Sequence, residues 1–191
     1  YDGLLMGVNL KNCKIYNNTA QYLGVGGSSV FYENTLIYNN TITAETAFES
    51  WGSTFINCTI VNNTVEGIGG IIQVYGWDFV TTTIINSIIW NNSPCVGFPE
   101  DPLTIYCGAG QINYIVDPVN YEGQTRLIIT NSIIMGLNEN EDVLGLVLGE
   151  NVSSSNPGFN SDFSVADQSN TIGLGADSLL LTIQENESLT T

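Results

Sequence analysis

The most regular feature of the chain is a seven-residue phrase in which polar and apolar positions alternate between framing asparagines. It reads Asn12-Cys-Lys-Ile-Tyr-Asn-Asn18, Asn34-Thr-Leu-Ile-Tyr-Asn-Asn40, Asn57-Cys-Thr-Ile-Val-Asn-Asn63 and Asn86-Ser-Ile-Ile-Trp-Asn-Asn92, with a degenerate copy at Asn131-Ser-Ile-Ile-Met-Gly-Leu137. A period of two around β-branched residues predicts a strand, and the closing asparagines predict a turn. Each copy therefore predicts a strand followed by a corner.

Two positions of the phrase keep their side-chain character in every copy. The residue after the first asparagine is small: Cys13, Thr35, Cys58, Ser87 and Ser132. Two residues further on stands an isoleucine: Ile15, Ile37, Ile60, Ile89 and Ile134. We predict that these isoleucines stack as one ladder in the core.

The spacing of the copies sets the length of the repeat. The first asparagines stand at 12, 34, 57, 86 and 131, so the unit is roughly 22 residues with loop insertions. The longest step leaves room for a missing copy, which we place at Asn113-Tyr-Ile-Val-Asp117. Glycine-rich stretches at 24–30 and 67–74 predict at least one further strand per coil.

These features favour an all-β parallel β-helix solenoid of about six to eight coils over other repeat folds. Helical repeats have longer periods and different composition, and leucine-rich repeats need leucines where this chain has isoleucine, serine or asparagine. We expect residues 1–191 to form a single domain, the C-terminal part of a longer solenoid, with 138–191 as an irregular closing segment.

The repeats resemble those of right-handed parallel β-helix proteins of the pectin-lyase-like superfamily, especially secreted microbial surface and adhesin-like proteins. The stretches Asn156-Pro-Gly-Phe159, Asp162-Phe-Ser-Val165 and Asn170-Thr-Ile-Gly-Leu-Gly175 resemble the segment that closes such β-helices, with Asn156 in place of aspartate and Asn170-Thr171 in place of Ser-Pro. The resemblance implies a right-handed solenoid and says little about function.

Composition excludes several functions. Charged residues make up 12% of the chain, the net charge is −16, and Lys11, Lys14 and Arg126 are the only cations, which argues against nucleic acid and anionic lipid as partners. There is no histidine, which removes Ser-His-Asp and Cys-His catalysis. Apolar runs are too short to insert into a membrane.

Cysteines and asparagine sequons suggest an extracellular setting. Cys95 and Cys107 flank an irregular loop and are a candidate disulfide, whereas Cys13 and Cys58 share a column two coils apart, too far for a bridge, and should be buried free thiols. Seven sequons are candidate glycosylation sites, with hydrogen-bonded asparagine stacks as the favoured alternative for those in the repeat: Asn17, Asn39, Asn57, Asn62, Asn91, Asn151 and Asn186.

The acidic residues are the remaining candidate chemistry. We predict no cofactor and expect the acidic residues to lie in solvated loops. The alternative is a calcium ion bound by Glu139, Glu141, Asp142 and Glu150, or by Glu100 and Asp101. A glycosidase needs two carboxylates about 5–10 Å apart, yet Glu33, Glu45, Glu49 and Asp78 are scattered along the sequence. We assign no catalytic residue and no metal ligand.

Aromatic residues form a second candidate surface. Tyr16, Tyr38 and Trp90 share one outward column that could bind sugar rings or protein, or could cover a neighbouring loop, and Val61 interrupts it. The sequence therefore predicts a non-catalytic structural or adhesive rod, extracellular or at the cell surface. A carbohydrate-binding or polysaccharide-degrading β-helix, and a subunit of a self-assembling filament joined through the solenoid ends, are the alternatives.

Overall fold

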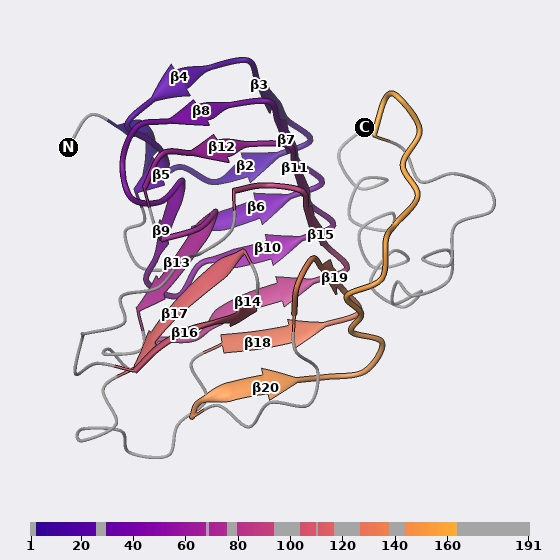
Figure 1. Cartoon of the computed structure of the whole chain (residues 1–191). Coiled ribbons are helices and arrows are strands. Elements are labelled where there is room, and N and C mark those ends of the chain that lie inside the picture. The colour runs from indigo at the N-terminus through magenta and orange to yellow at the C-terminus, as the bar shows by residue number, and fades with distance from the viewer. Residues whose placement is uncertain are drawn as a thin grey trace, which may run out of the picture.

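The computed structural model describes residues 3–25, 30–67, 69–75, 80–93, 104–109, 111–116, 127–137 and 144–163. Every regular element in these ranges is a strand, and the strands form four sheets wound around a common interior (Figure 1). The strands of successive coils pair in parallel, and an isolated antiparallel bridge joins Gly70 to Ile112. The chain is therefore an all-β solenoid of parallel strands, as the repeat predicts.

Two of the sheets hold six strands each. Sheet A contains β1 (Gly3–Met6), β5 (Tyr22–Val25), β9 (Phe48–Ser50), β13 (Ile72–Tyr75), β17 (Ile112–Val116) and β16 (Thr104–Ala109), in that spatial order. Sheet B contains β2 (Leu10–Lys11), β6 (Phe31–Glu33), β10 (Thr54–Ile56), β14 (Thr82–Ile85), β18 (Leu127–Thr130) and β20 (Leu146–Leu148). The pairing of β16 with β17 is antiparallel, so β16 covers one end of sheet A with a hairpin strand.

The other two sheets are shorter. Sheet C contains β3 (Lys14–Tyr16), β7 (Leu36–Tyr38), β11 (Thr59–Val61), β15 (Ile88–Trp90) and β19 (Ile133–Ile134). Sheet D contains β4 (Thr19–Ala20), β8 (Thr41–Ile42) and β12 (Thr64–Val65). A complete coil, such as β5 to β8, thus passes through sheets A, B, C and D in turn, and the repeated phrase supplies the strand in sheet C.

The predicted isoleucine column exists as a continuous ladder in sheet C. Strand register pairs Ile15 with Ile37, Ile37 with Ile60, Ile60 with Ile89, and Ile89 with Ile134. The last four side chains are at most 1% exposed, whereas Ile15 is half-buried because β3 is the edge strand of the sheet. Each coil therefore buries its isoleucine against the same residue of the next coil, about 4.8 Å away.

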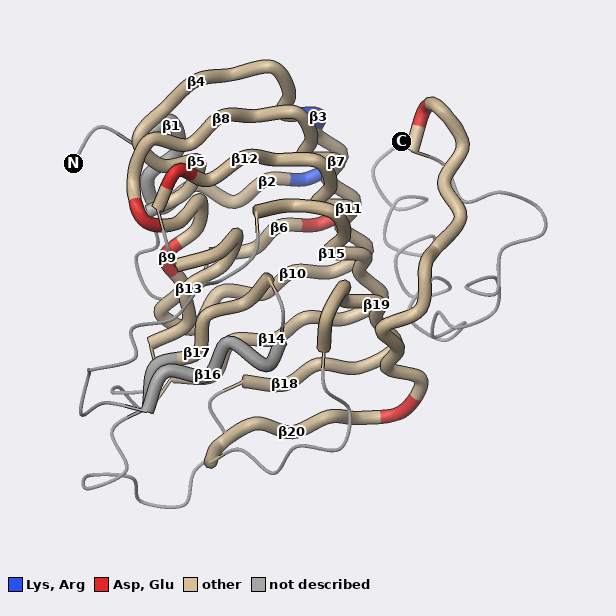
Figure 2. The backbone as a smooth tube through the Cα atoms, viewed as in Figure 1, with Lys and Arg blue, Asp and Glu red and all other residues tan. Residues whose placement is uncertain are grey.

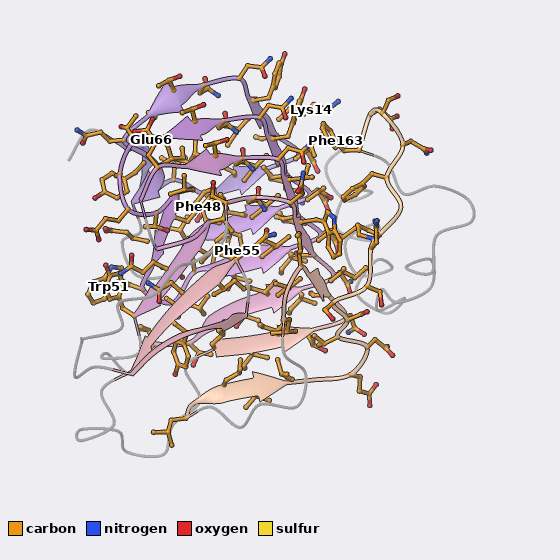
Figure 3. All side chains as sticks on the ribbon, viewed as in Figure 1. Lys14, Phe48, Trp51, Phe55, Glu66 and Phe163 are labelled. Carbon is orange, nitrogen blue, oxygen red and sulfur yellow. The ribbon has the colours of Figure 1, made fainter. Side chains whose placement is uncertain are left out.

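An aromatic cluster fills the interior between sheets A and B. Tyr32 stacks on Phe55 with ring centroids 4.7 Å apart, and Phe48 meets both rings edge-on. Figure 3 labels Phe48 and Phe55 among the side chains of the solenoid. Gly24 lies above this cluster, where a Cβ atom would come within 2.5 Å of the Tyr32 hydroxyl and 2.9 Å of the Phe48 ring. The glycine at this position is thus required by packing.

Two expectations about the coils are corrected by the structure. The segment around Asn113 is not a missing copy of the phrase, because Ile112–Val116 forms β17 in sheet A and pairs with β13. Ile89 and Ile134 are direct register partners, so the long step between them is one coil with an insertion. The closing segment 138–191 is also not irregular throughout, since β20 extends sheet B.

Candidate functional site

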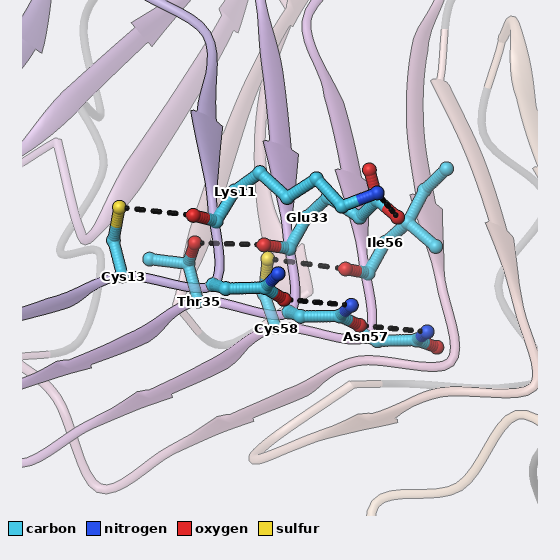
Figure 4. A network of polar contacts seen from close by, with 9 residues as sticks. Lys11, Cys13, Glu33, Thr35, Ile56, Asn57 and Cys58 are labelled. Atoms are coloured by element: carbon cyan, nitrogen blue, oxygen red, sulfur yellow. Dashed lines mark hydrogen bonds and ion pairs between the residues drawn. The ribbon is translucent and has the colours of Figure 1, made fainter. Parts of the chain in front are cut away.

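The corner between sheets B and C is built by the first asparagine of each phrase and the small residue after it (Figure 4). Asparagines at this corner have φ near +50°, the left-handed region that asparagine tolerates: Asn12, Asn34, Asn57, Asn86, Asn131 and Asn151. Side-chain amides link the coils at 3.1 Å from Asn34 to Asn12, 3.0 Å from Asn57 to Asn34 and 2.9 Å from Asn151 to Asn131. Here the predicted asparagine stacks are present.

The small residues close this corner with a bond to the strand before it. Thr35 Oγ1 donates to the Glu33 carbonyl at 2.9 Å, and Ser87 and Ser132 make the same bond to Ile85 and Thr130 at 2.8 and 2.7 Å. The thiols of Cys13 and Cys58 donate to the equivalent carbonyls at 3.2 and 3.4 Å. The column thus selects a short side chain with one donor, which cysteine, serine and threonine share.

A buried asparagine ladder fixes the corner between sheets C and D. The Nδ2 of Asn18 donates to the Oδ1 of Asn40 at 2.9 Å, Asn40 donates to Asn63 at 2.8 Å, and Asn63 donates to Asn92 at 2.8 Å. Gln111 Oε1 accepts from Asn92 and ends the series. Asn40, Asn63 and Asn92 are at most 7% exposed, so this network lies inside the solenoid and holds successive coils together.

Six of the seven sequon asparagines fall in the described part of the chain, and Asn186 lies outside it. Asn17, Asn39, Asn91 and Asn151 are exposed, while Asn57 and Asn62 are half-buried. The amide of Asn91 donates to Asn62 at 2.7 Å. Hydrogen-bonded stacks and accessible amides thus coexist at these corners, and glycosylation remains a prediction.

The cysteines have different environments. Cys58 is a buried free thiol, and Cys13 is also free but only half-buried, because it belongs to the coil at the open end of sheet C. Burial raises the pKa of the Cys58 thiol to about 12. The candidate pair Cys95 and Cys107 lies outside the residues whose side chains the structure describes.

We expect Cys58 to resist alkylation in the native protein. A thiol with a pKa near 12 is about one ten-thousandth thiolate at pH 8, and the thiolate is the nucleophile. Iodoacetamide labelling followed by peptide mass spectrometry should modify Cys13 at least about a hundredfold faster than Cys58. In denaturant both should react alike, and equal labelling in the native protein would contradict the assigned burial.

The charged candidates are spread out along the described chain (Figure 2). Lys11 pairs with Glu33 at 3.3 Å on the outer face of sheet B, and Lys14 is exposed at the start of β3. Within the described ranges no group of three cysteine, aspartate or glutamate residues could hold a metal ion. Glu150 is exposed, whereas the other calcium candidates (Glu100, Asp101, Glu139, Glu141, Asp142), together with Asp78 and Arg126, lie outside these ranges.

The aromatic column of sheet C is partly stacked and partly covered. The rings of Tyr16 and Tyr38 stack at 5.0 Å with an interplanar angle of 7°, and Tyr16 is 48% exposed. Phe163, from the C-terminal part of the described chain, packs on Tyr38 at 4.9 Å. Val61 is buried and Trp90 is half-buried. The column thus contains an exposed ring stack at one coil and a contact with a neighbouring segment at the next, while binding of sugar or protein by it stays a prediction.

A polar and aromatic surface on the outer face of sheet A was missed by the sequence analysis. Glu49, Gln73 and Asn113 are register partners on successive strands and alternate with residues that face the core; Glu49 is half-buried, whereas Gln73 and Asn113 are themselves buried. Beside them Trp51 stacks on Tyr75 at 4.4 Å with an interplanar angle of 16°. We call these five residues the sheet A face. Figure 3 shows Trp51 at the outer edge of the solenoid, away from Phe48 and Phe55.

Asn113 is the most unusual residue of the sheet A face. Its side chain is fully buried, and neither its Nδ2 nor its Oδ1 has a hydrogen-bond partner. A buried polar atom without a partner costs about 1–3 kcal/mol. Such groups in proteins are typically completed by ordered water or by a ligand.

Electrostatics also distinguish Glu49 on this face. Burial, followed by the negative charge of nearby Glu45, raises the pKa of the Glu49 carboxyl above its usual range. The folded state therefore disfavours the charged form of Glu49. The contribution of this carboxyl to stability is most favourable at pH values below its ordinary pKa and is lost as the pH rises through the raised pKa.

We expect Glu49→Gln to increase stability at neutral pH, because the uncharged amide avoids this penalty. Glu49 is partly exposed, so the gain in unfolding free energy should be below about 1 kcal/mol. Urea denaturation should show the gain at pH 7 and its loss as the pH falls below about 4. Glu66→Gln, at an exposed carboxylate, is the matched control for removing one negative charge; an equal gain there would refute the effect of the Glu49 environment.

The comparisons with known proteins give no relative. No protein-family model, curated protein or solved structure matches the chain. Among the described residues there is no helix long and apolar enough to cross a membrane.

Proposed function

We propose that the chain is a structural or adhesive solenoid of a secreted or cell-surface protein, and that it acts without catalysis. The observation that carries this proposal is the buried ladder of Asn18, Asn40, Asn63 and Asn92, ended by Gln111. Together with the isoleucine ladder it ties coil to coil on two sides of the interior. A solenoid held in this way is a stiff spacer whose outer faces are available for contacts.

We also propose that the chain belongs with the right-handed β-helices of the pectin-lyase-like superfamily. Support comes from parallel strands, from left-handed asparagines at a corner of each coil, and from the repeated phrases. Membership leaves the activity open, since one fold hosts many functions.

An assay for polysaccharide cleavage tests the non-catalytic part of the proposal. The protein should release neither reducing sugars nor unsaturated products from pectin, alginate or glucan, in the presence or absence of added calcium. Turnover on any of these that is lost in Glu49→Gln would replace the proposal with a carbohydrate-active enzyme. Electron microscopy of the purified protein tests the alternative of self-assembly. The proposed role predicts single particles, whereas filaments would favour the self-assembling subunit.

Carbohydrate binding by the sheet A face is a second candidate function. The stack of Trp51 on Tyr75 offers a platform for a sugar ring, and the half-buried carboxylate of Glu49 beside it offers an acceptor for the hydroxyl groups of the sugar. The observation that favours this candidate is the stack of two half-buried aromatic rings beside the Glu49 carboxylate. Affinity electrophoresis on the same polysaccharides should show retardation that Trp51→Ala removes. The matched control is Phe31→Ala, at an exposed aromatic ring on sheet B. Equal retardation of the unmodified protein, Trp51→Ala and Phe31→Ala would reject the sheet A face as the carbohydrate-binding site.

A further inference from the structure

A groove of about 340 Å³ lies on the outer side of sheet C, away from the sheet A face. It is lined by Asn34, Thr35, Leu36, Asn57, Thr59, Asp162 and Phe163. One wall comes from the corner between sheets B and C, and the other from residues 152–163, which we call the strap. Trp51 and Phe163 are on opposite sides of the molecule in Figure 3, so the groove and the sheet A face are separate.

The strap is anchored to the solenoid at both ends. Near its start, Ser153 donates its backbone N–H to the Ser132 carbonyl at 2.9 Å and accepts from Ile134 at 2.9 Å. Near its end, the ring of Phe163 rests on Tyr38 at 4.9 Å and meets Phe159 edge-on at 6.2 Å. The strap therefore forms a fixed wall of the groove.

Phe163 has a backbone conformation that is rare for an aromatic residue. Its φ is +65°, in the left-handed region, and its N–H donates to the Asn160 carbonyl at 3.0 Å. A strained residue persists only where its surroundings determine it, here through the contacts with Tyr38 and Phe159. The strain places a flat aromatic ring in the groove wall.

The opposite wall offers polar atoms that are held in position. Asn57 donates its amide to Asn34 at 3.0 Å, which orients the side chain, and its Oδ1 accepts no hydrogen bond from the described residues. Thr59, next to it along the groove, is half-buried. Asp162 adds a carboxylate and Leu36 an aliphatic surface. The groove thus combines a flat ring, an oriented acceptor, a hydroxyl and a carboxylate.

We infer that this groove binds a single neutral saccharide residue. The apolar face of the sugar stacks on the Phe163 ring, and its hydroxyl groups donate to Asn57 Oδ1 and bond with the Thr59 hydroxyl. The volume suits a ligand of this size. This inference does not depend on the proposed spacer role, nor on binding at the sheet A face.

Ligand-observed saturation-transfer NMR on unglycosylated protein tests the groove. Unglycosylated protein is required because Asn57-Cys58-Thr59 is a sequon whose glycan would occupy the groove. The probes are the methyl glycosides of glucose, galactose, mannose and N-acetylglucosamine, each titrated separately. At least one should receive saturation through its apolar ring protons.

Phe163→Gly and Thr59→Val are the informative variants. Glycine tolerates the left-handed backbone at 163 but removes the contacts of the ring with Tyr38 and Phe159 as well as the stacking surface. Thr59→Val leaves the strap intact, because valine matches the shape of threonine without its hydroxyl, and it therefore tests the groove itself. Each variant should raise the Kd for the glycoside about tenfold or more, while the circular dichroism spectrum of the strands is unchanged. Trp51→Ala, on the sheet A face, is the matched control and should leave this binding intact.

Three results would overturn the inference. They are no saturation transfer to any of the four glycosides, binding unchanged in Phe163→Gly, and binding lost in Trp51→Ala but kept in both groove variants. The last result would assign the sugar to the sheet A face, and so would separate failure of the groove from failure of the second candidate function.

Discussion

Asn63→Ala should lower the free energy of unfolding by about 3–4 kcal/mol, one of the two largest effects that we expect from a single substitution. Asn63 is 2% exposed, and its side chain takes part in five hydrogen bonds. Its Oδ1 accepts from the backbone and side chain of Asn40, and its Nδ2 donates to the Ile37 and Val61 carbonyls and to Asn92. Alanine leaves the buried backbone N–H of Asn40 without its acceptor and removes the donor to Asn92 and to the Ile37 and Val61 carbonyls, whereas Asn40 Nδ2 keeps the Ile15 and Tyr38 carbonyls. Urea denaturation followed by circular dichroism measures the loss.

The neighbouring residue provides the control for this substitution. Asn62 is half-buried, has a φ of +56° and accepts one amide bond from Asn91. Asn62→Gly keeps the left-handed backbone and should cost less than about 1 kcal/mol. Similar losses for the two variants would mean that the inner ladder contributes nothing beyond the turn itself.

Ile60→Ala should cost about 3–4 kcal/mol, because it opens a cavity at the middle of the isoleucine ladder. Ile60 is 1% exposed and lies between Ile37 and Ile89. Ile15→Ala removes the same atoms from the edge strand β3, where the side chain is half-buried, and should cost about half as much. The same denaturation experiment compares them, and equal costs would be incompatible with a ladder that ends at Ile15.

The sequence predicted the part of the fold that repeats. Isoleucines recur at the same place in the phrase because each must fill the same space above its partner, and asparagines recur because each corner needs a left-handed residue. A position that accepts only one residue type in every coil produces a regular sequence repeat, and such a repeat can be recognised without a structure. Parallel sheets and the corner stacks follow from it directly.

The sheet A face could not be found in the same way. Glu49, Gln73 and Asn113 share a column, but the outer face imposes no single residue type, and the loops between them differ in length. A weak signal exists: each lies directly after a buried Phe or Ile, in Phe48-Glu49, Ile72-Gln73 and Ile112-Asn113. The Asn113 segment was instead assigned to the phrase by its asparagine and isoleucine, although register with β13 decides its sheet.

The groove on sheet C also escaped sequence analysis, for a different reason. Its walls come from Asn57 and Thr59 on one side and Asp162 and Phe163 on the other, about a hundred residues apart. The strap contains the stretch Asn156-Pro-Gly-Phe159, which resembles the closing segments of β-helices. That resemblance predicts that the strap ends the solenoid, but it does not predict which face of the solenoid the strap covers. That depends on the pairing of Ile133 with Ser153 and on the contact between Phe163 and Tyr38.

The stacked isoleucine ladder is the claim on which the account depends, and methyl NMR measures it directly. In protein labelled at isoleucine δ1 methyl groups, with assignments from single Ile→Val variants, NOEs should join Ile37 to Ile60, Ile60 to Ile89, and Ile89 to Ile134. Methyls two coils apart, such as Ile37 and Ile89, are about 9.6 Å apart and should show none. Absence of the NOEs from Ile60 to Ile37 and Ile89, or a stronger NOE from Ile37 to Ile89, would contradict the solenoid.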